Sequence, residues 1–155
     1  MKKKRKKWPF FAGGAAILLI LVVVLLVVVG GLFSGPAHLD RDTYETLSER
    51  EYEKIVRNPE AHEGRKILVY GTVFQFDTRT GPEVFMADTG AQKVASIFYD
   101  QYTAVTGDAE VFVEVVEDDL VAIYASVAGT QVYETVSGDD REVPLLRASI
   151  VDVIG

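Results

Sequence analysis

The first forty residues set the strongest constraint on how this chain can fold. Positions 2–7 are all basic, and no formally charged residue follows until Asp40. Within the uncharged stretch, residues 17–29 are thirteen consecutive Ile, Leu or Val. Such residues favour membrane insertion by about 0.3 to 0.6 kcal/mol each at a helix centre, so the run alone contributes about 4 to 8 kcal/mol. We therefore predict a transmembrane helix over residues 8–33.

The basic residues predict the orientation of this helix. By the positive-inside rule they hold the N-terminus in the cytoplasm, so the rest of the chain is expected outside the plasma membrane. These topology residues are Lys2, Lys3, Lys4, Arg5, Lys6 and Lys7. The uncharged stretch is longer than the apolar core of a signal peptide, about 7–15 residues. A retained single-pass anchor is therefore favoured, and cleavage near Ala37 is the alternative.

The predicted organisation has four parts: a cytoplasmic tail (1–7), the helix (8–33), a linker (34–42) and an extracytoplasmic domain (43–155). The whole chain has 16 basic and 23 acidic side chains, so removing the six N-terminal bases leaves 10 against 23, a net charge of −13. Nucleic-acid binders need basic side chains to neutralise phosphates, so this balance disfavours nucleic acid as a partner. The chain contains no cysteine, so the outer domain depends on its core without disulfides.

Periodicity predicts one helix followed by β structure. Residues 43–57 are expected to be helical, with Ser48 and Glu51 forming a capping box and Asn58-Pro59 ending the helix. From residue 66 the apolar period becomes two. The expected strands are residues 66–76, 83–88, 92–100, 118–128, 131–136 and 143–154, with 101–109 irregular and 111–116 either a short strand or one helical turn. Short strands at close spacing predict a mainly β domain, a small barrel or sandwich.

Several segments of the outer domain together resemble a known family. They are residues 57–60 (RNPE), 63–66 (EGRK), 71–73 (GTV), 117–124 (EDDLVAIY), 129–134 (GTQVYE) and 143–150 (VPLLRASI). This pattern resembles the bacterial, often membrane-anchored, tRNA anticodon-binding-like OB-fold proteins, over residues 52–153. The resemblance implies a five-stranded OB-like Greek-key β-barrel whose binding face lies on its second and third strands.

Aromatic and basic side chains near that implied face are candidate contacts for a ligand or partner. The candidates are Phe74, Phe76, Arg79, Lys93, Tyr99 and Tyr102. Single-strand binders combine stacking rings with a positively charged groove, and only Arg79 and Lys93 supply charge here. Phe85 and Phe98 are expected to lie in the core, as most aromatic residues of a small β domain do.

No catalytic motif occurs in the sequence. It has no Gly-x-Ser-x-Gly elbow and no phosphate-binding glycine loop, and His38 and His62 lack the spacing of a zinc site. The acidic clusters 117–119 and 139–140 are expected to be charged turns, with Asp119 capping or turning the chain, and calcium binding is the alternative.

These features together predict a non-catalytic binding module without a cofactor. The module is expected to be tethered to the membrane and to bind an envelope protein or a modest ligand. One alternative is the binding of single-stranded nucleic acid or another polyanion by the OB face. The other alternative is a calcium-stabilised adhesion domain.

Overall fold

The computed structural model describes residues 39–76, 83–95, 98–134 and 138–155, which belong to a unit spanning His38–Gly155. None of the helices in these ranges is long and apolar enough to cross a membrane. The predicted anchor over residues 8–33, the basic residues 2–7 and Arg79 all lie outside the described residues. The anchor and its orientation therefore stay predictions.

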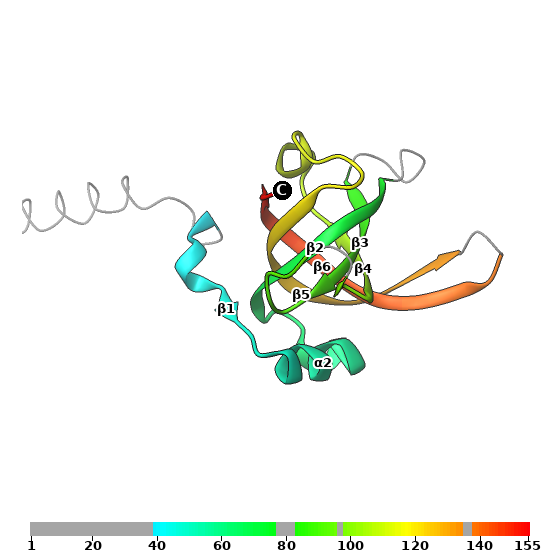
Figure 1. Ribbon diagram of the computed structural model, residues 1–155. Coiled ribbons are helices and arrows are strands. Elements are labelled where there is room, and N and C mark those ends of the chain that lie inside the picture. The colour runs from blue at the N-terminus through cyan, green and yellow to red at the C-terminus, as the bar shows by residue number, and fades with distance from the viewer. Residues whose placement is uncertain (1–38, 77–82, 96–97, 135–137) are drawn as a thin grey trace, which may run out of the picture. The chain divides into compact units, whose positions relative to one another are not determined.

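Five strands close into a barrel (Figure 1). They are β2 (Lys66–Phe76), β3 (Val84–Gly90), β4 (Gln101–Thr106), β5 (Leu120–Glu134) and β6 (Asp140–Val153). Neighbours follow the order β2-β3-β4-β6-β5, and β5 pairs back with β2. Every contact in the barrel is antiparallel except the parallel β4–β6 pair. This confirms the predicted mainly β fold, and its order is that of a five-stranded Greek-key barrel such as the OB fold.

The two ends of the barrel are closed by residues from outside its strands (Figure 1). At one end, Tyr52 and Ile55 of helix α2 (Glu49–Arg57) enter the core. At the other end lies Phe112 of the 3-10 helix η5 (Ala109–Phe112). Its ring packs edge-on against Phe85, with 5.1 Å between the centroids. A closed barrel of this size needs such plugs because its own side chains leave its mouths open to water.

Helix α2 is shorter than predicted and begins at its cap. Ser48 and Glu51 form the predicted capping box: the Glu51 amide donates to Ser48 Oγ (3.3 Å) and the Ser48 amide to Glu51 Oε2 (3.0 Å). Leu47, just before the cap, and Tyr52 are both buried in the same cluster, as in a hydrophobic staple. The preceding residues are not part of the helix. They form η2 (Arg41–Thr43) and β1 (Glu45–Thr46), a sixth strand that pairs in parallel with β2.

The first predicted strand has the predicted bounds, but a bulge changes its faces. Val73 pairs with Ala87 and Gln75 pairs with Met86, so β2 has one extra residue, Phe74, at this point. Such an insertion reverses the alternation of side chains along a strand. Phe74 is therefore exposed, while Phe76 packs against the core. Phe76, predicted together with Phe74 as a contact on the binding face, therefore lies on the opposite side of the strand from Phe74.

The chain between residues 89 and 116 differs from the prediction. The expected strand over residues 92–100 is wrong, because the described residues in that range are not in a strand, and β4 occupies residues 101–106, which were expected to be irregular. β4 was not predicted because one of its inward-facing residues is polar. Thr103 is fully buried, and its hydroxyl lies 2.7 Å from that of Thr89, whose hydroxyl lies 2.6 Å from Tyr52 Oη. Buried hydroxyls that form hydrogen bonds with one another are tolerated in a core. From sequence alone, however, a threonine is expected to be exposed.

Strand β5 runs through the point where a turn was predicted. Gly129 and Thr130 lie inside this strand, at a shift in the register between β5 and β6. Gly129 has a φ of +96°, which favours glycine and allows a bulge here. The short 3-10 helix η3 (Pro59–His62) follows α2 and lies against this part of β5.

Candidate binding face

An aromatic pair lies on the outer face of β2, β3 and β4. The Phe74 and Tyr102 rings have centroids 5.4 Å apart and planes tilted by 52°. Phe74 is 36% exposed and Tyr102 is 40% exposed. Tyr102 on β4 is the cross-strand partner of Asp88 on β3, and Asp88 is the partner of Thr72 on β2. The bulge at Phe74 turns that ring toward Tyr102, so two predicted residues meet on one surface.

A carboxylate with an unsatisfied oxygen lies beside this pair. Asp88 Oδ1 and Thr72 Oγ1 are both buried, and neither has a hydrogen-bond partner among the described residues. Partial burial raises the pKa of the Asp88 carboxyl, and the nearby charge of Asp100 raises it further. A buried acceptor without a donor is costly in a folded protein. An incoming cation or hydrogen-bond donor would remove that cost.

A second, small apolar cluster lies between β3, β4 and β6. Met86, Ala104 and Val143 form a small buried cluster, against which Tyr133 and Leu145 pack. Met86, Ala104 and Val143 are at most 6% exposed, so this cluster adds little accessible surface to the Phe74–Tyr102 pair. Neither Asp88 nor the nearly buried Met86 was predicted from the sequence to lie in this region. A carboxylate within an otherwise apolar strand was the available signal for Asp88.

The other predicted aromatic contacts lie elsewhere. Tyr99 is only 6% exposed; its hydroxyl accepts from the Val94 amide (3.0 Å) and donates to the Gln92 carbonyl (3.2 Å). Tyr99 was expected to be available for stacking and instead holds the β3–β4 loop in place. Phe76 stacks inside on Phe85, which is fully buried as predicted. Phe98 was expected in the core and is 69% exposed, so that expectation was wrong.

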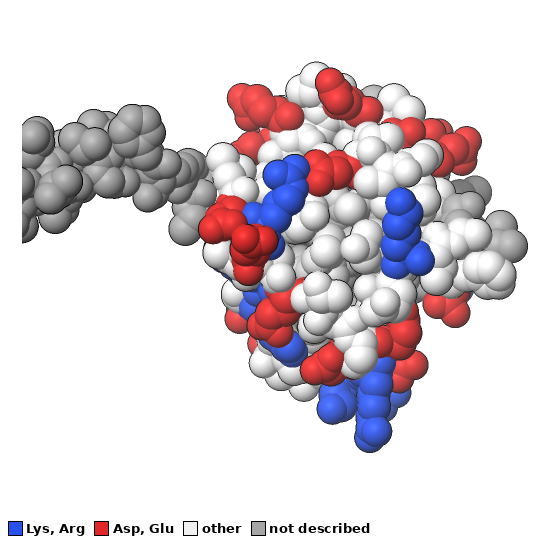
Figure 2. Space-filling view, turned by 60° about the vertical axis from the view of Figure 1, so that its left-hand side comes forward, with Lys and Arg blue, Asp and Glu red and all other residues white. Residues whose placement is uncertain are grey.

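Among the described residues, the basic side chains do not form a groove beside the aromatic pair. Lys93 is exposed in the β3–β4 loop. Elsewhere three arginines pair with acids: Arg41 with Asp152 (2.8 Å), Arg65 with Glu45 (2.6 Å) and Arg147 with Asp108 (3.8 Å). Figure 2 shows acidic side chains spread over the visible face, with basic ones singly or in small groups among them. This distribution gives a polyanion no continuous track of positive charge on that face.

The acidic cluster at residues 117–119 is used for the turn before β5. The Asp119 carboxylate accepts from the Val116 amide (2.8 Å), which confirms its predicted role. Glu117 Oε1 accepts from the Phe76 amide (3.2 Å), and Asp118 adopts a φ of +72°. Within the described ranges, no group of three or more His, Asp or Glu side chains is arranged to hold a metal ion.

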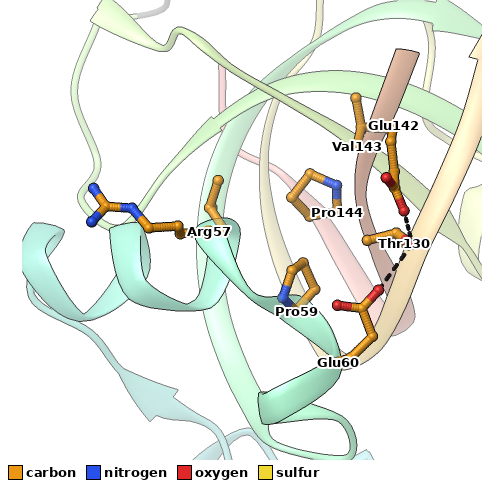
Figure 3. A pocket seen from close by; sticks show the side chains of 8 residues that line it. Arg57, Pro59, Glu60, Thr130, Glu142, Val143 and Pro144 are labelled. Atoms are coloured by element: carbon orange, nitrogen blue, oxygen red, sulfur yellow. Dashed lines mark hydrogen bonds between the residues drawn. The ribbon is translucent and has the colours of Figure 1, made fainter. Parts of the chain in front are cut away.

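A pocket of about 340 Å³ lies between α2, η3 and the β5–β6 hairpin (Figure 3). Its walls are apolar at Val56, Pro59 and Pro144, and Arg57 also lines it, with its guanidinium directed away from the other labelled side chains. Thr130 Oγ1 lies 2.7 Å from Glu142 Oε1 and 3.2 Å from Glu60 Oε1. The single hydroxyl proton can be donated to only one of these two carboxylates at a time.

Comparisons with known proteins give little further guidance. No protein-family model and no curated protein matches this chain. Among solved structures, the chain is similar to the mitochondrial single-stranded DNA-binding protein Rim1 of S. cerevisiae, with 17% identity and a TM-score of 0.33. That match covers 57% of this chain and 91% of Rim1. A likeness this weak carries no inference about function.

Proposed function

We propose that this chain is a non-catalytic binding module, which presents the outer face of β2, β3 and β4 to a protein partner. The observation that carries this proposal is the half-exposed Phe74–Tyr102 pair beside Asp88, whose buried oxygen has no donor among the described residues. Paired rings offer a large contact area at low cost in side-chain entropy. A carboxylate at their edge adds a specific charge requirement.

The chemistry of this face selects a partner with apolar and basic side chains. An apolar side chain would cover the two rings, while a lysine or arginine would reach Asp88 and satisfy its oxygen. A phosphate backbone would meet Asp88 and Asp100 instead, in a segment with a net charge of −13. The alternative of single-stranded nucleic acid therefore ranks below a protein partner.

The proposed location depends on the N-terminal sequence. The apolar run over residues 17–29 and the basic residues before it support a membrane anchor with the barrel outside the cytoplasm. An envelope protein is then the partner within reach of the face. The resemblance to membrane-anchored OB-fold proteins supports the same layout.

Capture by the full-length chain in detergent tests this function. Wild type, the Phe74→Ala/Tyr102→Ala double variant and Asp88→Asn are compared as baits on solubilised membranes of the source cell. The matched control is Val113→Ala/Val116→Ala, which removes two exposed apolar side chains from another region. We expect one stoichiometric protein on wild type and the control, and its loss from the double variant.

Asp88→Asn separates binding from folding. Its burial penalises the charged carboxylate, so the amide variant is expected to melt at a higher temperature than wild type at pH 7 and yet to capture less partner. A variant that merely damaged the fold would have a lower melting temperature as well as weaker capture. Capture that is unchanged in both face variants, or salt-sensitive binding of an oligo(dT) probe by wild type, would contradict the proposal.

A further inference from the structure

The outer ends of β5 and β6 form a two-stranded arm that projects from the barrel (Figure 1). We define this arm as residues 130–134 of β5 and 140–144 of β6, which pair from Thr130↔Pro144 to Glu134↔Asp140. β2 pairs with β5 only as far as Ser126, and β4 pairs with β6 only from Leu145. Among the described strands, the arm therefore has no ladder partner on either side.

The backbone of Val132 faces the free edge of β5. The backbone groups of Val127 point away from β6: its amide donates to the Arg65 carbonyl (3.0 Å), and its carbonyl accepts from the Gly64 amide (2.8 Å). The bulge after Val127 inserts one residue, so Thr130 and Val132 point to that same side.

Two further observations agree with this orientation. Pro144 pairs with Thr130. A proline has no N–H, and it fits here because the N–H at this position would point away from β5 and would not bond to it. In addition, the Val132 carbonyl accepts from its neighbour's side chain, Gln131 Nε2 (2.9 Å). A side-chain amide that covers an edge carbonyl can be replaced by a backbone N–H of an incoming strand.

The two edges of the arm are protected to different degrees. The β6 edge carries Pro144 and the charged side chains of Asp140 and Glu142, which discourage pairing with another chain. The β5 edge has no charge over residues 130–133, and Val132 is 56% exposed. An uncharged, exposed edge with outward backbone groups is the feature that strand addition uses.

The charges around the β5 edge identify the kind of strand that fits. Glu60 and Glu142 converge on the Thr130 hydroxyl, which can satisfy one of them at a time (Figure 3). A second copy of the chain would bring together two such sites and two segments of net charge −13, which repel each other. A basic side chain would instead be attracted.

We propose that an extended, basic polypeptide segment of a partner adds as a strand to the β5 edge at Val132. Its backbone pairs with the outward amide and carbonyl of Val132, and a lysine or arginine lies beside Glu60 and Glu142. The pocket of about 340 Å³ next to these carboxylates has room for that side chain. This surface is separate from the Phe74–Tyr102 face, so the inference goes beyond the proposed function.

Peptide selection on the full-length chain in detergent tests this inference. The probe is a phage library of random decapeptides, and binding of the enriched peptides is then measured on variants. We expect enriched peptides to combine Lys or Arg with β-branched residues. Val132→Pro removes the outward N–H and leaves the β5–β6 ladder bonds intact, so we expect about tenfold weaker binding or more. Val132→Ala keeps that N–H and is the matched control, with binding within about twofold of wild type.

A second variant guards against damage to the arm by proline. Glu60→Gln/Glu142→Gln leaves the backbone unchanged and is expected to weaken binding of the basic peptides and reduce its salt dependence. Phe74→Ala/Tyr102→Ala is expected to leave peptide binding unchanged, which separates this inference from the proposed function. The inference is overturned if no peptide is enriched, if enriched peptides are not basic, or if Val132→Pro binds them like wild type. A dimer that Val132→Pro dissociates in light scattering would assign the edge to a second copy and also overturn it.

Discussion

The buried hydroxyl network beneath helix α2 gives a quantitative test of how this barrel is held together. Thr89 Oγ1 lies 2.6 Å from Tyr52 Oη, 2.7 Å from Thr103 Oγ1 and 3.0 Å from the Gln101 carbonyl. Thr89→Val preserves the shape of the side chain and removes this central hydroxyl. Tyr52 then has only Thr103 Oγ1, 3.4 Å away. Leaving a buried hydroxyl without a good partner costs about 1 to 3 kcal/mol.

Tyr52→Phe is expected to cost less than Thr89→Val. Thr89 can still donate to the Gln101 carbonyl, and Thr103 can donate to Thr89 or to the same carbonyl. No buried donor is then left over, so the loss is that of one net hydrogen bond, about 0.5 to 1.5 kcal/mol. The double variant lacks both partners of the 2.6 Å bond, so we expect a total below the sum of the single losses, with a coupling of about 1 kcal/mol.

Thermal unfolding of the full-length chain, followed by the near-ultraviolet circular dichroism of its tyrosines, measures these losses. Each kcal/mol corresponds to roughly 4 to 8 °C in Tm for a domain of up to about 100 residues. The matched control is Tyr102→Phe, because that ring is half-exposed and we expect almost no shift. Additive losses, or a smaller loss for Thr89→Val than for Tyr52→Phe, would refute the network as described.

Four further predictions concern single sites. Gly71→Ala would place a Cβ 2.6 Å from the Asp88 carbonyl oxygen. We expect it to lower the free energy of unfolding, measured by chemical denaturation, by about 1 to 3 kcal/mol. The control Gly155→Ala would meet only a side chain at 3.5 Å and should leave that free energy unchanged. Ser48→Ala removes the helix cap and should cost about 0.5 to 2 kcal/mol. The amide and hydroxyl of Ser48 hold the pKa of Glu51 below its ordinary value, so the contribution of Glu51 to stability is present above pH 4.5 and should fade as the pH falls through its lowered pKa. The pKa of Asp88 is raised instead, so its contribution is present at low pH and lost as the pH rises; the Tm advantage of Asp88→Asn at neutral pH should therefore disappear on acidification, and an advantage that grows would contradict this sign.

Local sequence rules predicted the elements whose formation depends on residues close together in the chain. The capping box at Ser48 and Glu51 and the bounds of the strand Lys66–Phe76 follow from local chemistry and are confirmed, but the predicted alternation holds only as far as Val73. β4 was missed because its inward residue, Thr103, is polar and has its shortest hydrogen bond, 2.7 Å, with Thr89, a residue of another strand. The strand through Gly129 was missed because a glycine suits a bulge as well as a turn.

The sequence predicted which types of residue form the candidate site, but not which residues of those types belong to it. Phe74 and Tyr102 were predicted as candidate contacts and are both exposed, although Tyr102 lies in a strand and not in the irregular segment that was expected. Tyr99 and Phe76 could not be distinguished from them by sequence. Burial of Tyr99 depends on hydrogen bonds to its own loop, and that of Phe76 depends on a one-residue bulge. Asp88 gains its significance only from the tertiary structure that buries its oxygen.

Site-specific photo-crosslinking tests the central claim, that the outer face of the barrel binds a protein, most directly. Benzoyl-phenylalanine is placed at Tyr102 or, as a control, at the exposed Val113 in the full-length chain, and the chain is irradiated in membranes of the source cell. We predict one major crosslinked protein from position 102, which is absent from position 113 and lost on Asp88→Asn. The claim would be contradicted by no crosslink at position 102, or by the same products from both positions.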